Sequence, residues 1–145
     1  MSGKEPGDSA SGLRPNKRHF TGHDSNGKSV YIDSPPQKYY GLEGFGWVAR
    51  SFATDSIPAV MKDNADIAKY KNDRGSASFR KRDIVIPGGG VHLVVMDLAP
   101  GGESAFHRTK SVDFSICVMG EIEHTLDSGE KVRLLPGIIL YNEAR

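Results

Sequence analysis

A histidine, a threonine and an aspartate in one short segment are the side chains of this sequence best suited to chemistry. His107, Thr109 and Asp113 share the same parity in the segment that follows the turn at Pro100. Because side chains alternate between the faces of a β-strand, an extended segment directs all three toward one cavity. The same alternation packs the apolar side chains on the other side, namely Phe114, Ile116 and Val118.

An imidazole and a carboxylate that face one apolar cavity can work as a general acid–base pair. In this interpretation His107 is the base, Asp113 orients it, and Thr109 donates a hydrogen bond to a carbonyl group of the substrate. Dehydration, isomerisation or decarboxylation of a small molecule would need no further group. The segment therefore predicts a catalytic site on one strand.

The elements that must position this site are short strands separated by turns. Asn26-Gly27 is a strong hairpin signal between two short β-rich segments, and glycine-rich turns recur at 88–90, 100–102, 127–130 and 136–137. Residues 121–126 alternate, which places Ile122, His124 and Leu126 on one face. Many short strands with almost no helix predict an all-β jelly roll or barrel.

The composition along the chain indicates one domain that follows an N-terminal tail. Residues 1–17 are rich in glycine, serine, proline and charge, so we expect a flexible tail, followed by one β-barrel domain over 18–145. Residues 59–75 show no clean helical period, so we expect a mobile loop with at most a helical turn. The aromatic segment 39–58 fits a bent strand, in which Arg50 and Phe52 are core residues or line a pocket.

The composition limits the function classes. The chain has 145 residues, a formal net charge of +1 and one cysteine, Cys117. A charge so close to zero argues against a nucleic-acid partner, and no apolar run is long enough to cross a membrane. A single cysteine excludes an internal disulfide, and no secretory leader is evident, so we expect a cytoplasmic protein. Cys117, which faces inward by parity, is expected to fill space rather than to react.

The central segment resembles the first motif of the cupin superfamily. That motif has a glycine turn, a His-x-His pair, an acidic residue a few positions later and a closing glycine. Here Gly101-Gly102, His107, Asp113 and Gly120 occupy the matching positions, Thr109 stands in place of the second histidine, and Asp113 replaces the usual glutamate. Segments over 18–31, 49–58, 107–114 and 120–137 are also similar to small cupin proteins of fungal secondary-metabolite pathways.

The resemblance implies a cupin-type jelly-roll barrel. It also implies a tailoring oxidoreductase that acts on a small hydrophobic, polyketide-like metabolite, and a homodimer. In cupins a second motif follows a Pro-Gly turn and ends in a metal-binding histidine. Pro136-Gly137 matches that turn, but the position of the histidine falls beyond Arg145. We therefore expect a C-terminally shortened barrel, with an exposed sheet edge or a closing strand from a partner.

A metal site is the first of three functional hypotheses. Iron, manganese, nickel or zinc would bind His107 and Asp113, with His124 recruited to restore two histidines and one carboxylate. The second hypothesis is the metal-free acid–base reaction. The third is a cupin that binds a small molecule without chemistry, in which His107 hydrogen-bonds to Thr109 or Asp113, Asp113 pairs with Arg108 or Lys110, and His124 is half-exposed.

Overall fold

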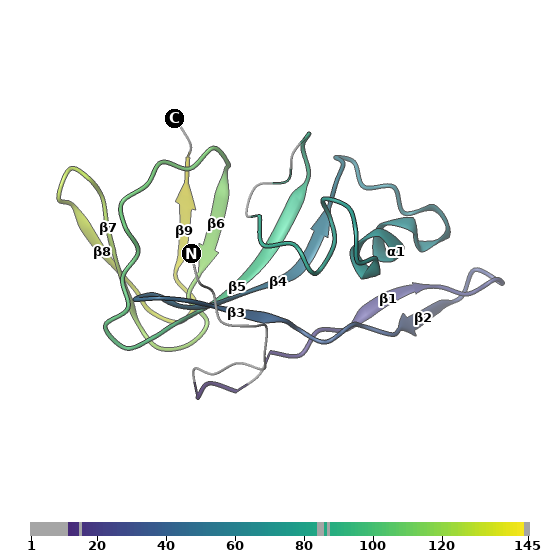
Figure 1. The fold of residues 1–145 in the computed structure, drawn as a ribbon, viewed down its shortest axis with the longest axis horizontal. Coiled ribbons are helices and arrows are strands. Elements are labelled where there is room, and N and C mark those ends of the chain that lie inside the picture. Colours follow the sequence, from purple (N-terminus) through teal and green to yellow (C-terminus); the bar gives the residue numbers. More distant parts are fainter. Residues whose placement is uncertain (1–11, 15, 84–85, 87, 144–145) are drawn as a thin grey trace. The chain divides into compact units, whose positions relative to one another are not determined.

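The computed structural model describes residues 12–14, 16–83, 86 and 88–143. They divide into two compact units, Met1–Ser104 and Ala105–Arg145, which we describe separately. In chain order the elements are β1 (Phe20–His23), β2 (Ser29–Ile32), β3 (Tyr39–Leu42), β4 (Gly46–Thr54), a 3-10 turn (Lys62–Asn64), α1 (Ala65–Lys71), β5 (Val91–Leu98), β6 (Asp113–Ile116), β7 (Ile122–Thr125), β8 (Lys131–Leu134) and β9 (Ile139–Asn142). Figure 1 labels the strands and α1.

All strand pairs are antiparallel. The first unit contains the β1–β2 hairpin and a sheet of order β3-β4-β5, and the second unit contains the pairs β6–β9 and β7–β8. The prediction of an all-β chain is thus confirmed. No helix within the described residues has the length and apolar character that a membrane span needs.

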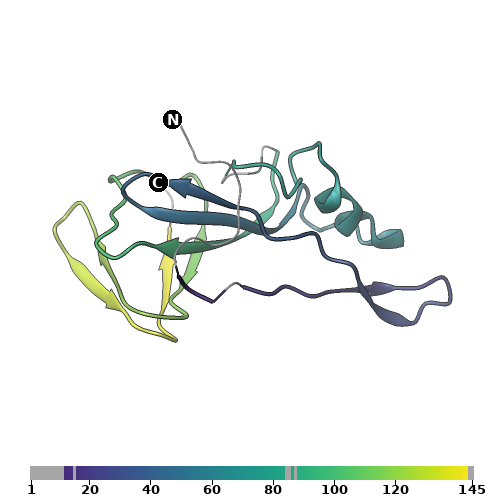
Figure 2. The same ribbon diagram turned by 60° about the horizontal axis from the view of Figure 1, so that its bottom comes forward.

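The β1–β2 hairpin forms where Asn26-Gly27 predicted it. The Asp24 carboxylate accepts hydrogen bonds from the backbone amides of Asn26 (2.8 Å) and Lys28 (2.9 Å), and Gly27 adopts a φ of 76°. A positive φ is accessible to glycine without strain, which explains the residue at this position. The hairpin is seen clearly in Figure 2.

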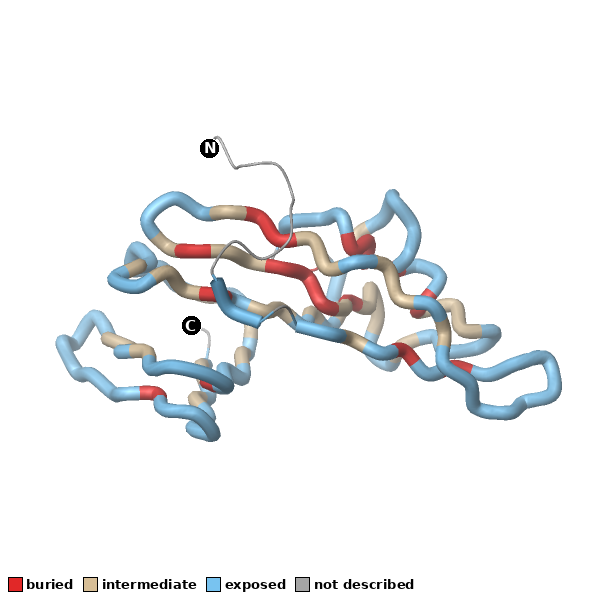
Figure 3. The backbone as a smooth tube through the Cα atoms, turned by 90° about the horizontal axis from the view of Figure 1, so that it is seen from below, coloured by how far each residue is buried: buried red, intermediate tan, exposed pale blue. Residues whose placement is uncertain are grey.

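Buried residues, red in Figure 3, occur along β4 of the three-stranded sheet, where Ala49, Arg50, Ser51 and Ala53 are all buried. In its central strand β4, the register against β5 shifts between Arg50 and Phe52, so that Arg50 and Ser51 are both buried. At the start of β4, an added Cβ on Gly46 would lie 2.1 Å from the Asp97 carbonyl oxygen, so only glycine allows the two backbones to approach this closely.

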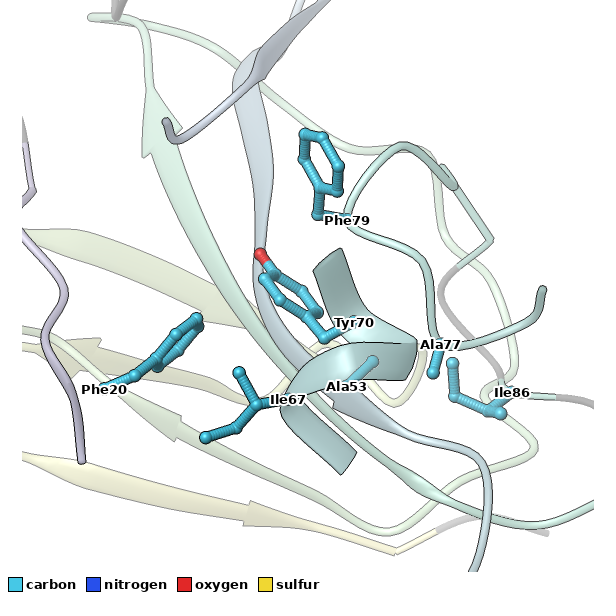
Figure 4. Close-up of a cluster of buried hydrophobic side chains, with 7 residues drawn as sticks. All are labelled: Phe20, Ala53, Ile67, Tyr70, Ala77, Phe79 and Ile86. Carbon is cyan, nitrogen blue, oxygen red and sulfur yellow. The ribbon is translucent and has the colours of Figure 1, made fainter. Parts of the chain in front are cut away.

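The prediction of a mobile loop over 59–75 is wrong in part, because α1 forms there. Ile67 and Tyr70, one helical turn apart, are 7% and 0% exposed and pack into the core of the first unit. The burial of these two large side chains stabilises a helix of seven residues. Because α1 has no longer apolar stripe, the sequence pattern did not reveal it. The cluster, shown in Figure 4, comprises Phe20, Ala53, Ile67, Tyr70, Ala77, Phe79 and Ile86.

The central segment is less regular than predicted. Strand β6 begins only at Asp113, and residues 103–109 form no strand, so strand alternation does not govern where His107 and Thr109 point. The prediction that Phe114, Ile116 and Val118 pack against a layer is also wrong. They are 72%, 56% and 79% exposed within the part of the chain that the structure describes.

The predicted flexible tail, residues 1–17, lies mostly outside the described residues, which begin at Gly12 and omit position 15. Within its described part, the Asn16 side-chain amide donates a hydrogen bond to the Tyr39 hydroxyl at 3.1 Å. This contact ties the segment before β1 to the first residue of β3.

Candidate functional site

His107 lies in the irregular segment before β6, with its side chain exposed. Its Nδ1 atom is 2.9 Å from the carbonyl oxygen of Ala105. A carbonyl oxygen can only accept, so a hydrogen bond there requires the proton to be on Nδ1 in the neutral ring. That tautomer leaves the Nε2 lone pair directed away from the backbone, ready to accept a proton or to bind an electrophile.

Thr109 and Asp113 are connected through Ser111. The Ser111 hydroxyl donates to Asp113 Oδ1 at 2.7 Å, and the Thr109 hydroxyl donates to the Ser111 carbonyl at 3.3 Å. No ion pair joins Asp113 to Arg108 or Lys110, all of which the structure describes. The serine therefore orients the carboxylate.

His124 lies on β7, on the face predicted from alternation. Ile122 and His124 share this face with their neighbours on β8, Leu134 and Val132, and His124 is half-buried. The opposite face is charged, with ion pairs from Lys131 to Glu123 (2.7 Å) and from Arg133 to Glu121. The imidazole is thus set against apolar side chains, away from the charged surface.

The described residues do not bring a metal site together. Among them, no group of three or more His, Cys, Asp or Glu side chains is placed to hold an ion. Asp113 Oδ1 accepts a hydrogen bond from the Ser111 hydroxyl. Nδ1 of His107 is engaged with the Ala105 carbonyl, so Nε2 is the ring nitrogen that remains for a ligand. Within the part of the chain that the structure describes, His107, Asp113 and His124 are therefore not assembled into a metal site.

Cys117 is buried, at 4% exposed, directly after β6. Its thiol is 3.6 Å and 3.8 Å from the carbonyl oxygens of Met119 and Gly120, and its backbone continues the pairing toward Ile138 at 3.3 Å. This burial agrees with the space-filling role expected from the sequence.

The same unit carries an exposed apolar face on the β6–β9 pair, on the other side of β6 from Asp113. Phe114 pairs with Tyr141 and Ile116 with Ile139, and the two aromatic rings are 5.5 Å apart. The four side chains are 55% to 72% exposed. Phe106, next to His107 in sequence, is also 72% exposed. The C-terminal unit thus offers apolar contact area to a hydrophobic molecule.

Sequence reasoning missed a polar network in the first unit. Arg50, only 4% exposed, donates to His92 Nε2 at 3.0 Å and to the carbonyls of Ser76 (2.7 Å) and Ser78 (3.0 Å), and also to that of Asp83. Burial lowers the pKa of the Arg50 guanidinium, and the Asp83 carboxylate partly offsets that effect. The signal for this network was an arginine in the middle of an otherwise apolar strand.

Tyr70 links this network to a second arginine. Its hydroxyl donates to the Arg50 carbonyl at 2.6 Å and accepts a hydrogen bond from Arg18. Burial raises the pKa of the Tyr70 hydroxyl, against the lowering effect of the Arg18 charge. No sequence pattern identified Arg18, because residues 18 and 70 are far apart in the chain.

Comparison with characterised proteins gives several relatives, although no protein-family model matches the chain. The chain is 37% identical over 123 residues to the phomopsin biosynthesis cluster protein D of Diaporthe leptostromiformis. The aligned region covers 81% of this chain and 61% of that protein. It is 30% identical over 135 residues to the cupin-domain-containing oxidoreductase fogC of Aspergillus ruber, covering 92% and 63%.

A third relative is the cupin-domain-containing oxidoreductase srdB of Neurospora crassa, 32% identical over 135 residues, covering 92% of this chain and 64% of that protein. The chain thus spans about three fifths of the length of these relatives. The relatives support the jelly-roll interpretation of the antiparallel strands described above. Together with the all-β fold, they identify the chain as a cupin-like protein, related to proteins of fungal secondary-metabolite clusters.

Proposed function

We propose that the protein takes part in tailoring a small hydrophobic metabolite in a fungal biosynthetic pathway, with His107 as the residue that moves a proton. The observation that carries this proposal is the hydrogen bond between His107 Nδ1 and the Ala105 carbonyl at 2.9 Å. It presents Nε2 as the basic nitrogen of an exposed ring.

The mechanism needs few groups. Nε2 of His107 accepts a proton from a carbon of the bound metabolite, and the electron pair of that C–H bond forms a new C=C bond. Return of the proton to a second carbon of the conjugated system gives an isomerisation. Return of the proton to a hydroxyl group as its C–O bond breaks releases water, which is a dehydration. Asp113, oriented by Ser111 at 2.7 Å, favours the imidazolium that forms if substrate binding brings the two together. Phe106, which precedes His107 and is 72% exposed, supplies apolar contact area for the hydrophobic part of the ligand.

The test compares metabolites in a strain that lacks the gene, complemented with the wild-type protein or with His107→Gln. The proposal expects the variant to accumulate the unprocessed intermediate while its protein level stays normal. His23→Gln is the matched control, because His23 is exposed in the hairpin and its contacts to Asn64 are through its backbone. Equal product from wild type and His107→Gln would reject the role of His107.

An oxidation is the second candidate, favoured by the name oxidoreductase that fogC and srdB carry. Iron, manganese, nickel or zinc at His107, Asp113 and His124 stays a prediction, which elemental analysis of the purified protein tests. Near-stoichiometric metal that is lost in both His107→Ala and His124→Ala would establish the oxidative site. If metal-free protein retains activity, the metal-dependent oxidation is excluded and the proton-transfer mechanism remains.

A further inference from the structure

A second candidate site lies in the N-terminal unit, between the segment before β1 and the turn before β3. A pocket of about 220 Å³ is lined there by Lys17, Arg18 and His19 on one side and by residues 34–37 on the other. Its lining contains three basic side chains and no carboxylate. It involves none of the residues of the proposed proton-transfer site.

Arg18 is held rigidly at this pocket. Its Nε donates to the Ser34 hydroxyl at 2.9 Å, and its Nη1 donates to Gln37 Oε1 (3.1 Å), to the Ser51 carbonyl (2.5 Å) and to the Tyr70 hydroxyl. The guanidinium carbon also lies 4.9 Å and 5.0 Å from the centres of the Phe20 and Tyr70 rings. An arginine fixed in this way loses little conformational freedom when it binds a ligand.

The positive charge of Arg18 is not neutralised by a side chain. Its hydrogen-bond acceptors are neutral hydroxyl, amide and carbonyl oxygens, and no described acidic residue forms an ion pair with it. Nη2 donates to the Pro35 carbonyl, which leaves its second N–H without an acceptor among these groups. A half-buried, unneutralised guanidinium that retains one donor favours an anion beside it.

The remaining lining fits an organic anion rather than a bare inorganic one. Lys17 is exposed and adds a second cation, while Pro35 and Pro36 supply apolar wall. The volume is below the range of about 300–1,000 Å³ that is typical of drug-sized ligands. The pocket therefore suits a small molecule with one acidic group and a short apolar part.

We propose that this pocket binds the carboxylate of a small organic acid, with Arg18 and Lys17 as the recognition residues. The carboxylate approaches the remaining Nη2 N–H of Arg18, Lys17 adds charge from the solvent side, and the apolar part of the acid lies against the prolines. This is a binding site distinct from the His107 segment.

The test is an NMR titration of the full-length ¹⁵N-labelled protein with sodium benzoate, with benzamide as the neutral analogue and inorganic phosphate as the other anion. The proposal expects saturable shifts of the backbone amides of residues 16–19, Ser34 and Gln37 with benzoate, and none with benzamide. Lys17→Gln should weaken benzoate binding several-fold, whereas Lys28→Gln, an exposed lysine in the hairpin turn, should not change it.

Arg18→Lys should weaken binding more than Lys17→Gln does, provided that its spectrum remains that of the folded protein. If Arg18→Lys does not fold, Lys17→Gln and its Lys28→Gln control still decide the proposal. Equal shifts with benzamide, saturation by phosphate alone, or benzoate binding that is unchanged in Lys17→Gln would each overturn it.

Discussion

The two units of this chain bury their side chains in different ways. In the first, aromatic residues from β1, β4 and α1 meet around Tyr70, and two arginines complete the polar contacts of the core. In the second, Cys117 and Leu134 are the buried apolar side chains among the described residues, while the face of β6–β9 remains exposed. Stability is therefore expected to reside mainly in the first unit, whereas the second exposes apolar side chains on β6–β9.

Removing the central ring should have the largest effect on stability. We expect Tyr70→Ala to lower the free energy of unfolding by about 3–5 kcal/mol, because it empties the space that Phe20, Phe52 and Phe79 surround. Urea denaturation measures the change. Tyr31→Ala is the matched control and should change the free energy by less than about 0.5 kcal/mol, since Tyr31 is 80% exposed.

Breaking the Arg50 network should have the next largest effect. Arg50→Met keeps the apolar part of the side chain but leaves the carbonyls of Ser76 and Ser78 without their donor. We expect a loss of about 1–3 kcal/mol in the same assay. Arg133→Met, which removes an exposed ion pair with Glu121, should cost less than about 1 kcal/mol. Equal losses in the two variants would contradict the structural role of Arg50.

A substitution on the exposed face of β6–β9 should cost little. Tyr141→Ala removes the ring contact to Phe114 at 5.5 Å, and we expect a loss of about 1 kcal/mol or less. A loss close to that of Tyr70→Ala would show that this face is covered in solution. Size-exclusion chromatography of both proteins would then show whether a second copy covers it, which would support the expected homodimer.

The pH dependence of stability should reveal the buried hydroxyl of Tyr70. Because burial raises its pKa above the usual value of 10.0, the unfolded chain releases this proton at a lower pH than the folded protein does. The stabilising contribution is complete below pH 10 and declines as the pH rises from there through the pKa of the folded state. To isolate this contribution, the urea midpoint of Tyr70→Phe is subtracted from that of the wild-type protein at each pH from 8 to 11. A difference that stays constant across this range would contradict the shift.

The sequence predicted the parts of the fold that depend on local signals. Asn26-Gly27 specified the hairpin, alternation placed Ile122 and His124 on one face, and the glycine turns separated the strands. It singled out residues 59–75 as the one plausible place for a helix but did not predict the extent of α1, because two anchors at Ile67 and Tyr70 gave too short an apolar stripe. It did not predict Arg18 at Tyr70 either, since that contact joins residues remote in the chain.

The candidate site was predicted in part. Residue types and spacing selected His107, Thr109 and Asp113, and the hydrogen bond from Ser111 to Asp113 adds a partner that no motif included. The sequence analysis applied strand alternation to His107 and Thr109, but β6 begins only at Asp113. Among the described residues, the segment around His107 is not paired in a strand. Alternation constrains a side chain only where the backbone is held extended by a partner strand.

In the proposed mechanism the Ala105 carbonyl fixes the proton of His107 on Nδ1 and leaves Nε2 as the base. A long-range ¹H–¹⁵N correlation spectrum of the imidazole rings at pH 8.5, assigned with His107→Gln, tests it directly. The account predicts that His107 carries its proton on Nδ1 and has an unprotonated Nε2. A His107 ring that carries its proton on Nε2 would contradict the hydrogen bond and, with it, the proposed proton transfer.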